Sequence, residues 1–169
     1  MTSFENVISD AFFAIVTDDL YAINPTTGEE GPGIMTKEET EADLQNIFKA
    51  AIPGFEFPRF ALYGFDSTTC DYEEDLTLEE VRIIANLMAL VWLQRQITSI
   101  ENTRQKASGA SFKLTSQASH LARLLSVKEA CEKTDRHAQR LYKRRKLDKE
   151  GKYLSNWSSL METSALNGN

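Results

Sequence analysis

The sequence has few of the residues that build metal sites and disulfide frameworks. Its 169 residues include two cysteines, Cys70 and Cys131, and two histidines, His120 and His137. None of them stands in a CxxC or Cys/His spacing, so the sequence supports no metal site. Cys131 and His137 are six residues apart, which on a helix sets them about 240° around the axis and not side by side. They therefore do not form a catalytic pair.

The sequence also lacks the signatures of an enzyme. No nucleophile, base and orienting residue stand in a recognisable pattern. The glycine-rich stretch 28–33 has two glutamates and no lysine, whereas a phosphate loop needs the lysine and a strand before it. The sequence predicts a non-enzymatic protein without a cofactor.

Long apolar runs are scarce. The longest, residues 83–93, is interrupted by Asn86, whereas a helix needs about twenty apolar residues to cross a bilayer. We therefore expect a buried core helix and no membrane contact. The first residues show no basic region followed by an apolar stretch, so nothing marks export, and a reducing cytosolic compartment is expected.

Charge is distributed unevenly along the chain. Residues 1–80 hold 18 acidic and 3 basic residues, a net −15, and residues 81–169 hold 7 acidic and 16 basic residues, a net +9. The two halves can fold against each other and neutralise locally, or copies of the chain can associate head to tail through opposite faces. Accidental patterning is the third explanation, and the sequence leaves all three open.

Apolar spacing of three and four residues predicts a mainly α fold. An amphipathic helix is expected over 4–16. Thr36 with Glu39, and Thr77 with Glu80, are capping-box signatures that mark the starts of two further helices.

The capping boxes predict helices over about 37–51 and about 78–106. The second of these is apolar on nearly every side in its first half, so we expect a helical bundle around a long buried central helix. A last helix is expected from Thr115 or Ser116, and it should leave the core partway along because its apolar content thins between 129 and 139.

The remaining segments set the predicted domain organisation. Residues 1–147 are expected to form a single helical domain, with a loop over 18–35 and irregular or extended chain over 52–75. The aromatic residues near 55–65 favour a short β-hairpin or an extended segment. Residues 148–169, rich in Ser and Asn, are expected to be a flexible, extended docking tail that orders on a partner.

A basic cluster over 136–152 is the strongest local charge signal, with eight basic and two acidic residues. It can pair with carboxylates on a protein, neutralise the phosphates of a nucleic acid, or form a solvated helix end. The candidate partner-binding residues are Arg136, Arg140, Tyr142, Lys143, Arg144, Arg145, Lys146, Tyr153 and Trp157.

Residues from about 75 to 155 resemble the head–tail connector, or neck adaptor, proteins of tailed bacteriophages. The resemblance is carried first by Leu76-Thr77-Leu78-Glu79-Glu80-Val81 with Ile84-Ala85-Asn86-Leu87-Met88 and Trp92-Leu93. After the break it is carried by Phe112-Lys113-Leu114-Thr115-Ser116-Gln117-Ala118-Ser119-His120-Leu121 and then by Leu141-Tyr142-Lys143-Arg144-Arg145. It covers about half of the chain and rests on a pattern of helices and short signatures. It has no catalytic motif.

This resemblance implies a non-enzymatic structural protein of the virion, assembled in the host cytoplasm. It implies a homo-oligomeric ring, a dodecamer in such connectors, that lies beneath the portal protein and docks through its basic C-terminal segment. Portal protein and neighbouring neck or tail proteins are then the partners, with DNA contact in the channel.

Two alternatives remain. The basic segment 136–152 also suits a small DNA-binding or packaging-associated protein, and the helical pattern also suits another tail-completion component. The acidic N-terminal half disfavours broad coating of DNA, because its charge repels the duplex.

Overall fold

The computed structural model describes residues 1–16, 35–107 and 114–144. A π-helical turn, η1 (Phe4–Ile8), continues into α1 (Ser9–Phe13). Helix α2 (Lys37–Ala51) is followed by a 3₁₀ turn, η2 (Ile52–Gly54), and the two long helices are α3 (Leu78–Ala107) and α4 (Leu114–Arg144). The mainly α fold predicted from the sequence is confirmed for these residues. The predicted loop over 18–35, but for Met35, and the predicted tail over 148–169 lie outside them.

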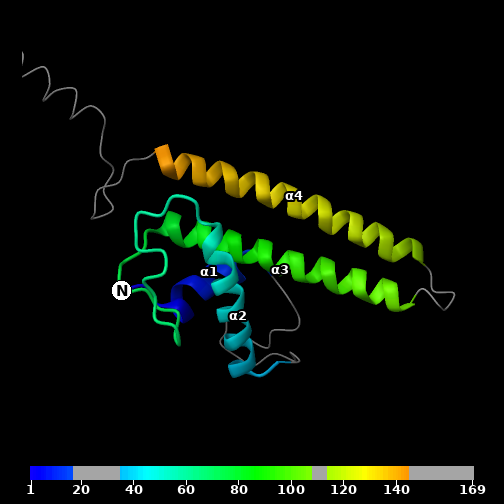
Figure 1. Ribbon diagram of the computed structural model, residues 1–169, viewed down its shortest axis with the longest axis horizontal. Coiled ribbons are helices and arrows are strands. Elements are labelled where there is room, and N and C mark those ends of the chain that lie inside the picture. The colour runs from blue at the N-terminus through cyan, green and yellow to red at the C-terminus, as the bar shows by residue number, and fades with distance from the viewer. Residues whose placement is uncertain (17–34, 108–113, 145–169) are drawn as a thin grey trace, which may run out of the picture.

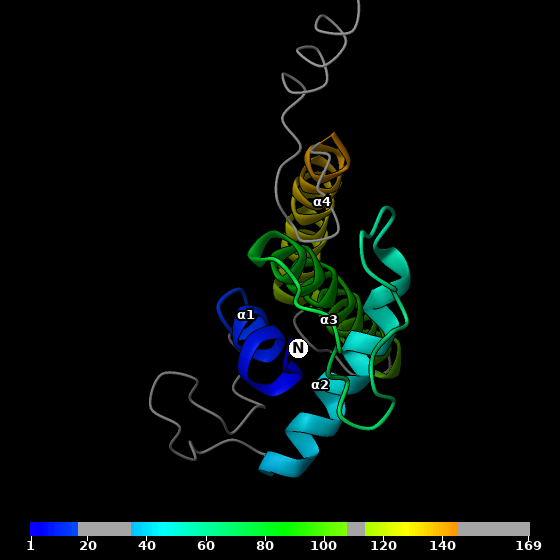
Figure 2. The same ribbon diagram turned by 90° about the vertical axis from the view of Figure 1, so that its left-hand side faces the viewer.

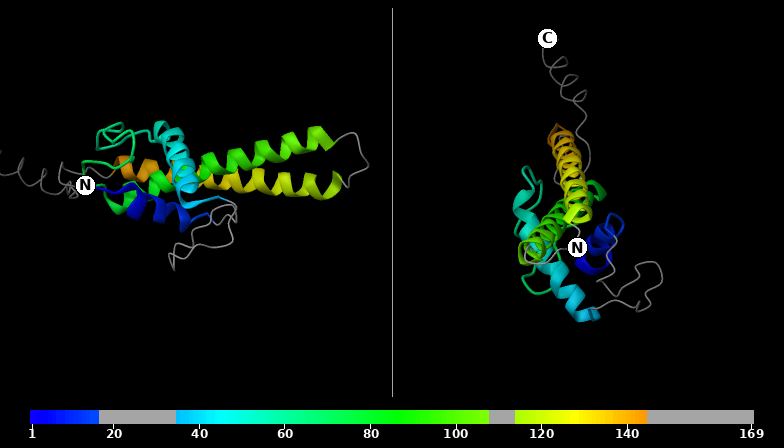
Figure 3. Two further views of the ribbon diagram at one scale, coloured as in Figure 1. Left: turned by 90° about the horizontal axis from the view of Figure 1, so that it is seen from below. Right: turned by 90° about the vertical axis from the view of Figure 1, so that its right-hand side faces the viewer.

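Helix α3 runs through the middle of the molecule. Helix α4 lies antiparallel along one side of it, and α1 and α2 pack on the other side (Figures 1 and 2). The end of α3 that follows Leu78 is enclosed by these elements. The distal halves of α3 and α4 extend beyond α1 and α2 as a projecting helix pair (Figure 3).

Helix α2 begins where the sequence predicts. The backbone N–H of Glu39 donates to the Thr36 hydroxyl at 3.2 Å, and the Glu39 carboxylate accepts from the Thr36 N–H at 2.9 Å. This reciprocal pair satisfies two amide groups that a helix start leaves without a partner. One face of the helix is buried, namely Thr40, Leu44, Ile47, Phe48 and Ala51.

Helix α3 contributes more buried apolar residues than any other described element. Ile83, Ile84, Ala85, Met88 and Ala89 are buried, so the apolar first half lies inside the fold as predicted. Leu78–Asn102 is long and apolar enough to cross a membrane by length and composition, and 44% of its most apolar window is buried. The core helix of a soluble protein meets the same criterion.

An aromatic cluster joins the loop after η2 to the rest of the core. Tyr72 packs edge to face on Phe48, Phe60 and Phe65, and Phe55 packs on Phe60. Each ring contact has the T-shaped geometry that aromatic quadrupoles favour.

The described part of the chain has no strand over 55–65. The chain there makes one isolated antiparallel bridge, between Phe65 and Tyr72, and Thr2 pairs with the same tyrosine. The physical reason is that Phe55 and Phe60 are both buried. In a regular strand, two residues five positions apart point to opposite sides, because successive side chains alternate. Of the two forms predicted there, the β-hairpin is wrong, and the segment is irregular.

The expectation that α4 leaves the core partway along is also wrong. Its apolar content does thin after Leu121, but Asp135, Gln139 and Tyr142 bring the helix back to the body. These three residues are spaced by four and three, which places them on one side of a helix. Polar contacts therefore hold the C-terminal half of α4.

Candidate protein-docking site

The C-terminal half of α4 has two faces of different character. The inward row of Asp135, Gln139 and Tyr142 contacts the body. The outward residues are Lys133, Arg136, Arg140, Lys143 and Arg144, all exposed and spaced by three, four or one along the helix. We call this set the basic face.

Gln139 fastens the middle of this helical segment to the turn after α2. Its Oε1 accepts from the backbone N–H of Glu56 at 2.8 Å, and its Nε2 donates to the Gly54 carbonyl at 3.1 Å. Nε2 also lies 2.7 Å from Oδ2 of Asp135. One amide thus satisfies two backbone groups more than eighty residues away in sequence.

Tyr142 fastens the end of the helix through a buried cluster that we call the latch, composed of Arg59, Glu80 and Tyr142. The Tyr142 hydroxyl donates to Oε1 of Glu80 at 2.5 Å and accepts from the backbone N–H of Arg59 at 3.1 Å. The Arg59 guanidinium donates from Nε and Nη2 to the two Glu80 oxygens, at 3.1 Å each. The Glu80 side chain has no solvent exposure.

Burial and hydrogen bonding act in opposite directions on Glu80. Burial would raise the pKa of this carboxyl, but hydrogen bonds from Arg59, Tyr142 and the Thr77 backbone hold the pKa below its ordinary value. Burial, and then the bond to the Glu80 carboxylate, raise the pKa of Tyr142. Glu80 is therefore ionised and Tyr142 neutral at physiological pH.

The latch corrects one predicted site residue. Tyr142 was expected on a partner-facing surface because basic residues surround it in the sequence. Its side chain is buried, with 4% exposure, and packs edge to face on Phe55. It positions the helix from inside and is not available to a partner.

The basic face retains most of its charge. Arg136 lies 3.7 Å from Glu132, which is shared with Lys128 at 3.2 Å. The Lys143 ammonium lies 3.7 Å from the centre of the Phe57 ring, a cation–π contact that orders the side chain without cancelling its charge. Arg140 and Arg144 have no carboxylate partner among residues 1–16, 35–107 and 114–144.

The other four predicted docking residues cannot be placed. Arg145, Lys146, Tyr153 and Trp157 lie outside the described residues. Arg145 and Lys146 follow Arg144 directly in the sequence. The structure brings together Arg136, Arg140, Lys143 and Arg144 on one side of α4.

Comparison with models of protein families, with curated proteins and with solved structures found no match.

The loop between η2 and α3 carries the opposite charge. Residues 55–77, which we call the acidic loop, hold six carboxylates and a single basic residue, Arg59. Arg59 forms its ion pair with Glu80 inside the latch, and its Nη2 also donates to the Asp75 carbonyl at 3.2 Å. Asp66, Glu73, Glu74 and Asp75 are exposed, and Asp75 pairs with the N-terminal ammonium of Met1.

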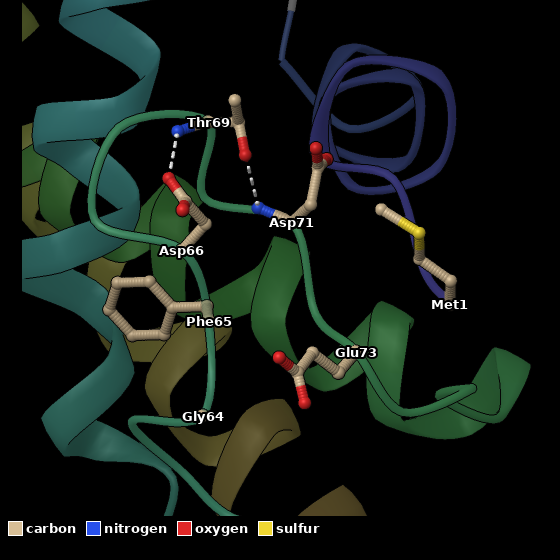
Figure 4. A pocket seen from close by; sticks show the side chains of 7 residues that line it. All are labelled: Met1, Gly64, Phe65, Asp66, Thr69, Asp71 and Glu73. Carbon is tan, nitrogen blue, oxygen red and sulfur yellow. Dashed lines mark hydrogen bonds between the residues drawn. The ribbon is translucent and has the colours of Figure 1, made fainter.

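A hollow of about 610 Å³ lies against this loop (Figure 4), lined by Met1, Gly64, Phe65, Asp66, Thr69, Asp71 and Glu73. Two of its carboxylates are engaged in the local backbone. Oδ1 of Asp66 accepts from the N–H groups of Thr68 and Thr69 at 2.7 and 3.0 Å. Oδ1 of Asp71 accepts from the Phe4 N–H at 2.7 Å.

Within the described segments, no group of three His, Cys, Asp or Glu residues is arranged to hold a metal ion. Cys131 lies on α4 partly buried, and His137, six residues later on the same helix, is exposed. The carboxylates of the hollow thus serve mainly to shape the loop and to make the surface acidic.

Sequence reasoning found the basic face but missed Arg59, Gln139 and Asp135. Arg59 did give a signal, since it is the single basic residue between 50 and 80 and an isolated charge of that kind often pairs inside a fold. Gln139 and Asp135 gave none, because polar residues on a surface helix are ordinary.

Proposed function

We propose that this chain is a non-catalytic structural subunit that docks onto other proteins through the basic face of α4. The observation that carries the proposal is the division of one helical segment into two sides. Gln139 and Tyr142 fix the inner side by hydrogen bonds at 2.5–3.1 Å. That attachment holds five exposed cations in a fixed register on the outer side.

A fixed cationic face suits a protein partner. Arginine forks pair with carboxylates in two-point geometry, and rigid placement reduces the entropy lost when the side chains are ordered on binding. The resemblance to head–tail adaptors names the assembly in which such a subunit would work. In this proposal the chain forms part of a ring beneath the portal, and portal protein, neck proteins and other copies of the chain are its partners in the virion.

Co-assembly of this chain with a tailed-phage portal protein tests the proposal. The Arg140→Glu/Arg144→Glu variant should lose complex formation in size-exclusion chromatography with light scattering, because it places carboxylates against a partner's carboxylates. Arg123→Glu is the matched control, since Arg123 is exposed on the same helix but outside the basic face. Unchanged complexes with the double variant would refute the proposal.

DNA binding is the second candidate, and the same exposed cations favour it. Phosphate contacts release counterions, so such binding weakens steeply with salt. A gel-shift titration of a duplex against salt separates the two functions. Binding at low salt that is lost steeply on adding salt, and is lost in Arg140→Glu/Arg144→Glu, would support it, whereas no shift at low salt would remove it.

A further inference from the structure

We infer that the basic face of one copy docks onto the acidic loop of a second copy, so that the chain assembles with itself through surfaces of opposite charge. This rests on the proposed function, in that the basic face is taken as a protein-docking surface, and it names the occupant of that surface.

The first ground is that the two surfaces do not neutralise each other within one molecule. Both lie at the end of the molecule where α3 begins and α4 ends (Figure 1). The contact between them is made by Lys143 with an aromatic ring, that of Phe57. Across the described ranges, no ion pair joins the basic face to Asp66, Glu73, Glu74 or Asp75.

The second ground is that Arg59, the single basic residue of the acidic loop, forms its ion pair with Glu80 inside the latch. Arg59 is directed inward to Glu80, and its side chain is 15% exposed. The loop is thereby left with exposed carboxylates, and α4 with exposed cations, in a molecule whose net charge is −6. Opposite charge on two separate faces of identical molecules favours contact between copies, and it also speeds their encounter.

The third ground is geometric. The basic face lies along a helix, with Arg140 and Arg144 one turn apart, and the carboxylates lie around a hollow bordered by Asp66 and Glu73 (Figure 4). In the inferred contact, the two arginines at the end of the helix pair with the exposed carboxylates beside the hollow. Two different faces are used, so the contact is heterologous unless a twofold axis pairs it twice, and heterologous contacts close into rings or extend into filaments.

Sedimentation velocity of the full chain against salt gives the first test. The wild type should associate at low salt, and its apparent Kd should rise about tenfold or more when salt shortens the Debye length to a few ångströms. A wild type that stays monomeric at low salt over the whole concentration range would overturn the inference.

Charge reversal gives the second test. Arg140→Glu/Arg144→Glu and Glu73→Lys/Glu74→Lys should each be monomeric, and a mixture of the two should associate again because the reversed charges are complementary. Arg123→Glu and Glu101→Lys are the controls, since both residues are exposed on the projecting helix pair and should leave self-association unchanged. Circular dichroism of each variant checks that it folds.

The results separate this inference from the proposed function. If both variants fold but their mixture fails to associate, a second copy is not the occupant of the basic face, whether or not the variants still bind portal protein. If the basic-face variant associates with itself as well as the wild type and also keeps its portal complex, both the inference and the proposed function fail. Restored association in the mixture supports the inference whichever way the portal test falls.

Discussion

The hydroxyl of Tyr142 donates a hydrogen bond of 2.5 Å to the buried carboxylate of Glu80, 62 residues earlier in the chain. This bond joins the last helical turn of α4 to the first turn of α3. Glu80 also closes the capping box of α3, since its Oε2 accepts from the Thr77 N–H at 2.7 Å. One carboxylate thus starts one helix and anchors the end of another.

Tyr142→Phe should lower the free energy of unfolding by about 1–3 kcal/mol, because it removes one of the two hydrogen bonds to Oε1 of the buried Glu80 and the acceptor of the Arg59 backbone N–H. Chemical denaturation measures the loss. Tyr63→Phe is the matched control, since that ring is 68% exposed, and it should change stability by less than about 0.5 kcal/mol. Equal effects at the two positions would mean that the latch contributes nothing.

Glu80→Gln should destabilise the fold by about 3–5 kcal/mol, because it leaves the Arg59 charge inside the protein without its partner. The wild type should also lose stability as the pH falls. The folded pKa of Glu80 lies below the ordinary value of 4.5, so the contribution is complete above that value and disappears as the pH falls through the folded pKa. Unfolding curves from neutral to acid pH should show this loss in the wild type and a weaker one in the variant.

Asp135→Asn should stabilise the protein at neutral pH, by about 1–2 kcal/mol, the scale of an unpaired buried polar group. Asp135 is buried, and its Oδ1 has no hydrogen-bond partner among the residues that the structure describes. Burial raises the pKa of this carboxyl, the bond from Gln139 offsets part of the effect, and Glu56 adds to the increase.

The raised pKa of Asp135 determines how stability changes with pH. A raised pKa in the folded state means that the fold favours the protonated carboxyl over the ionised one. The stability contribution of Asp135 is therefore highest below the ordinary pKa of Asp and is lost as the pH rises through the folded pKa. The variant should therefore exceed the wild type at neutral pH and approach it in acid. A wild type that is the more stable protein at neutral pH would contradict this prediction.

Leu87→Ala should cost about 2–5 kcal/mol, because it removes a large side chain from the buried half of α3 and leaves a cavity. Leu78→Ala tests the same change at the start of the same helix, where the side chain is 88% exposed. Thermal melts of both variants compare them directly. A loss below about 0.5 kcal/mol for Leu87→Ala would show that the centre of α3 is not the core.

The starts of α2 and α3 were predictable because their signals are local. A capping box needs a Thr and a Glu three residues apart, and both Thr36 with Glu39 and Thr77 with Glu80 form the reciprocal bonds. Contacts between residues far apart in the sequence follow no fixed spacing that a sequence could reveal. The latch draws on three segments, so the sequence could not show that Glu80 also holds Arg59 and Tyr142.

The candidate site was predictable in its charge but not in its orientation. Basic residues crowd the end of α4, and the sequence therefore indicated a docking segment there. The rotation of α4 about its own axis, relative to the body, decides which residue of this basic segment points inward. Asp135 and Gln139 face the body and so define that rotation. Because both are polar, the sequence gives no apolar pattern that marks the buried side of the helix, and Tyr142 was assigned to the wrong face.

The late position of Tyr142 has a consequence for synthesis on the ribosome. Phe55 needs this tyrosine as a ring partner, and Gly54 and Glu56 need Gln139, across 83 to 85 residues of chain. A nascent chain can form α2 and α3 as they emerge, but Phe55 lacks its ring contact with Tyr142 until residue 142 has left the exit tunnel. Exposed apolar surface of that kind is what chaperones bind, so a nascent chain stalled before Gln139 should bind a ribosome-associated chaperone, and release should follow once α4 is complete.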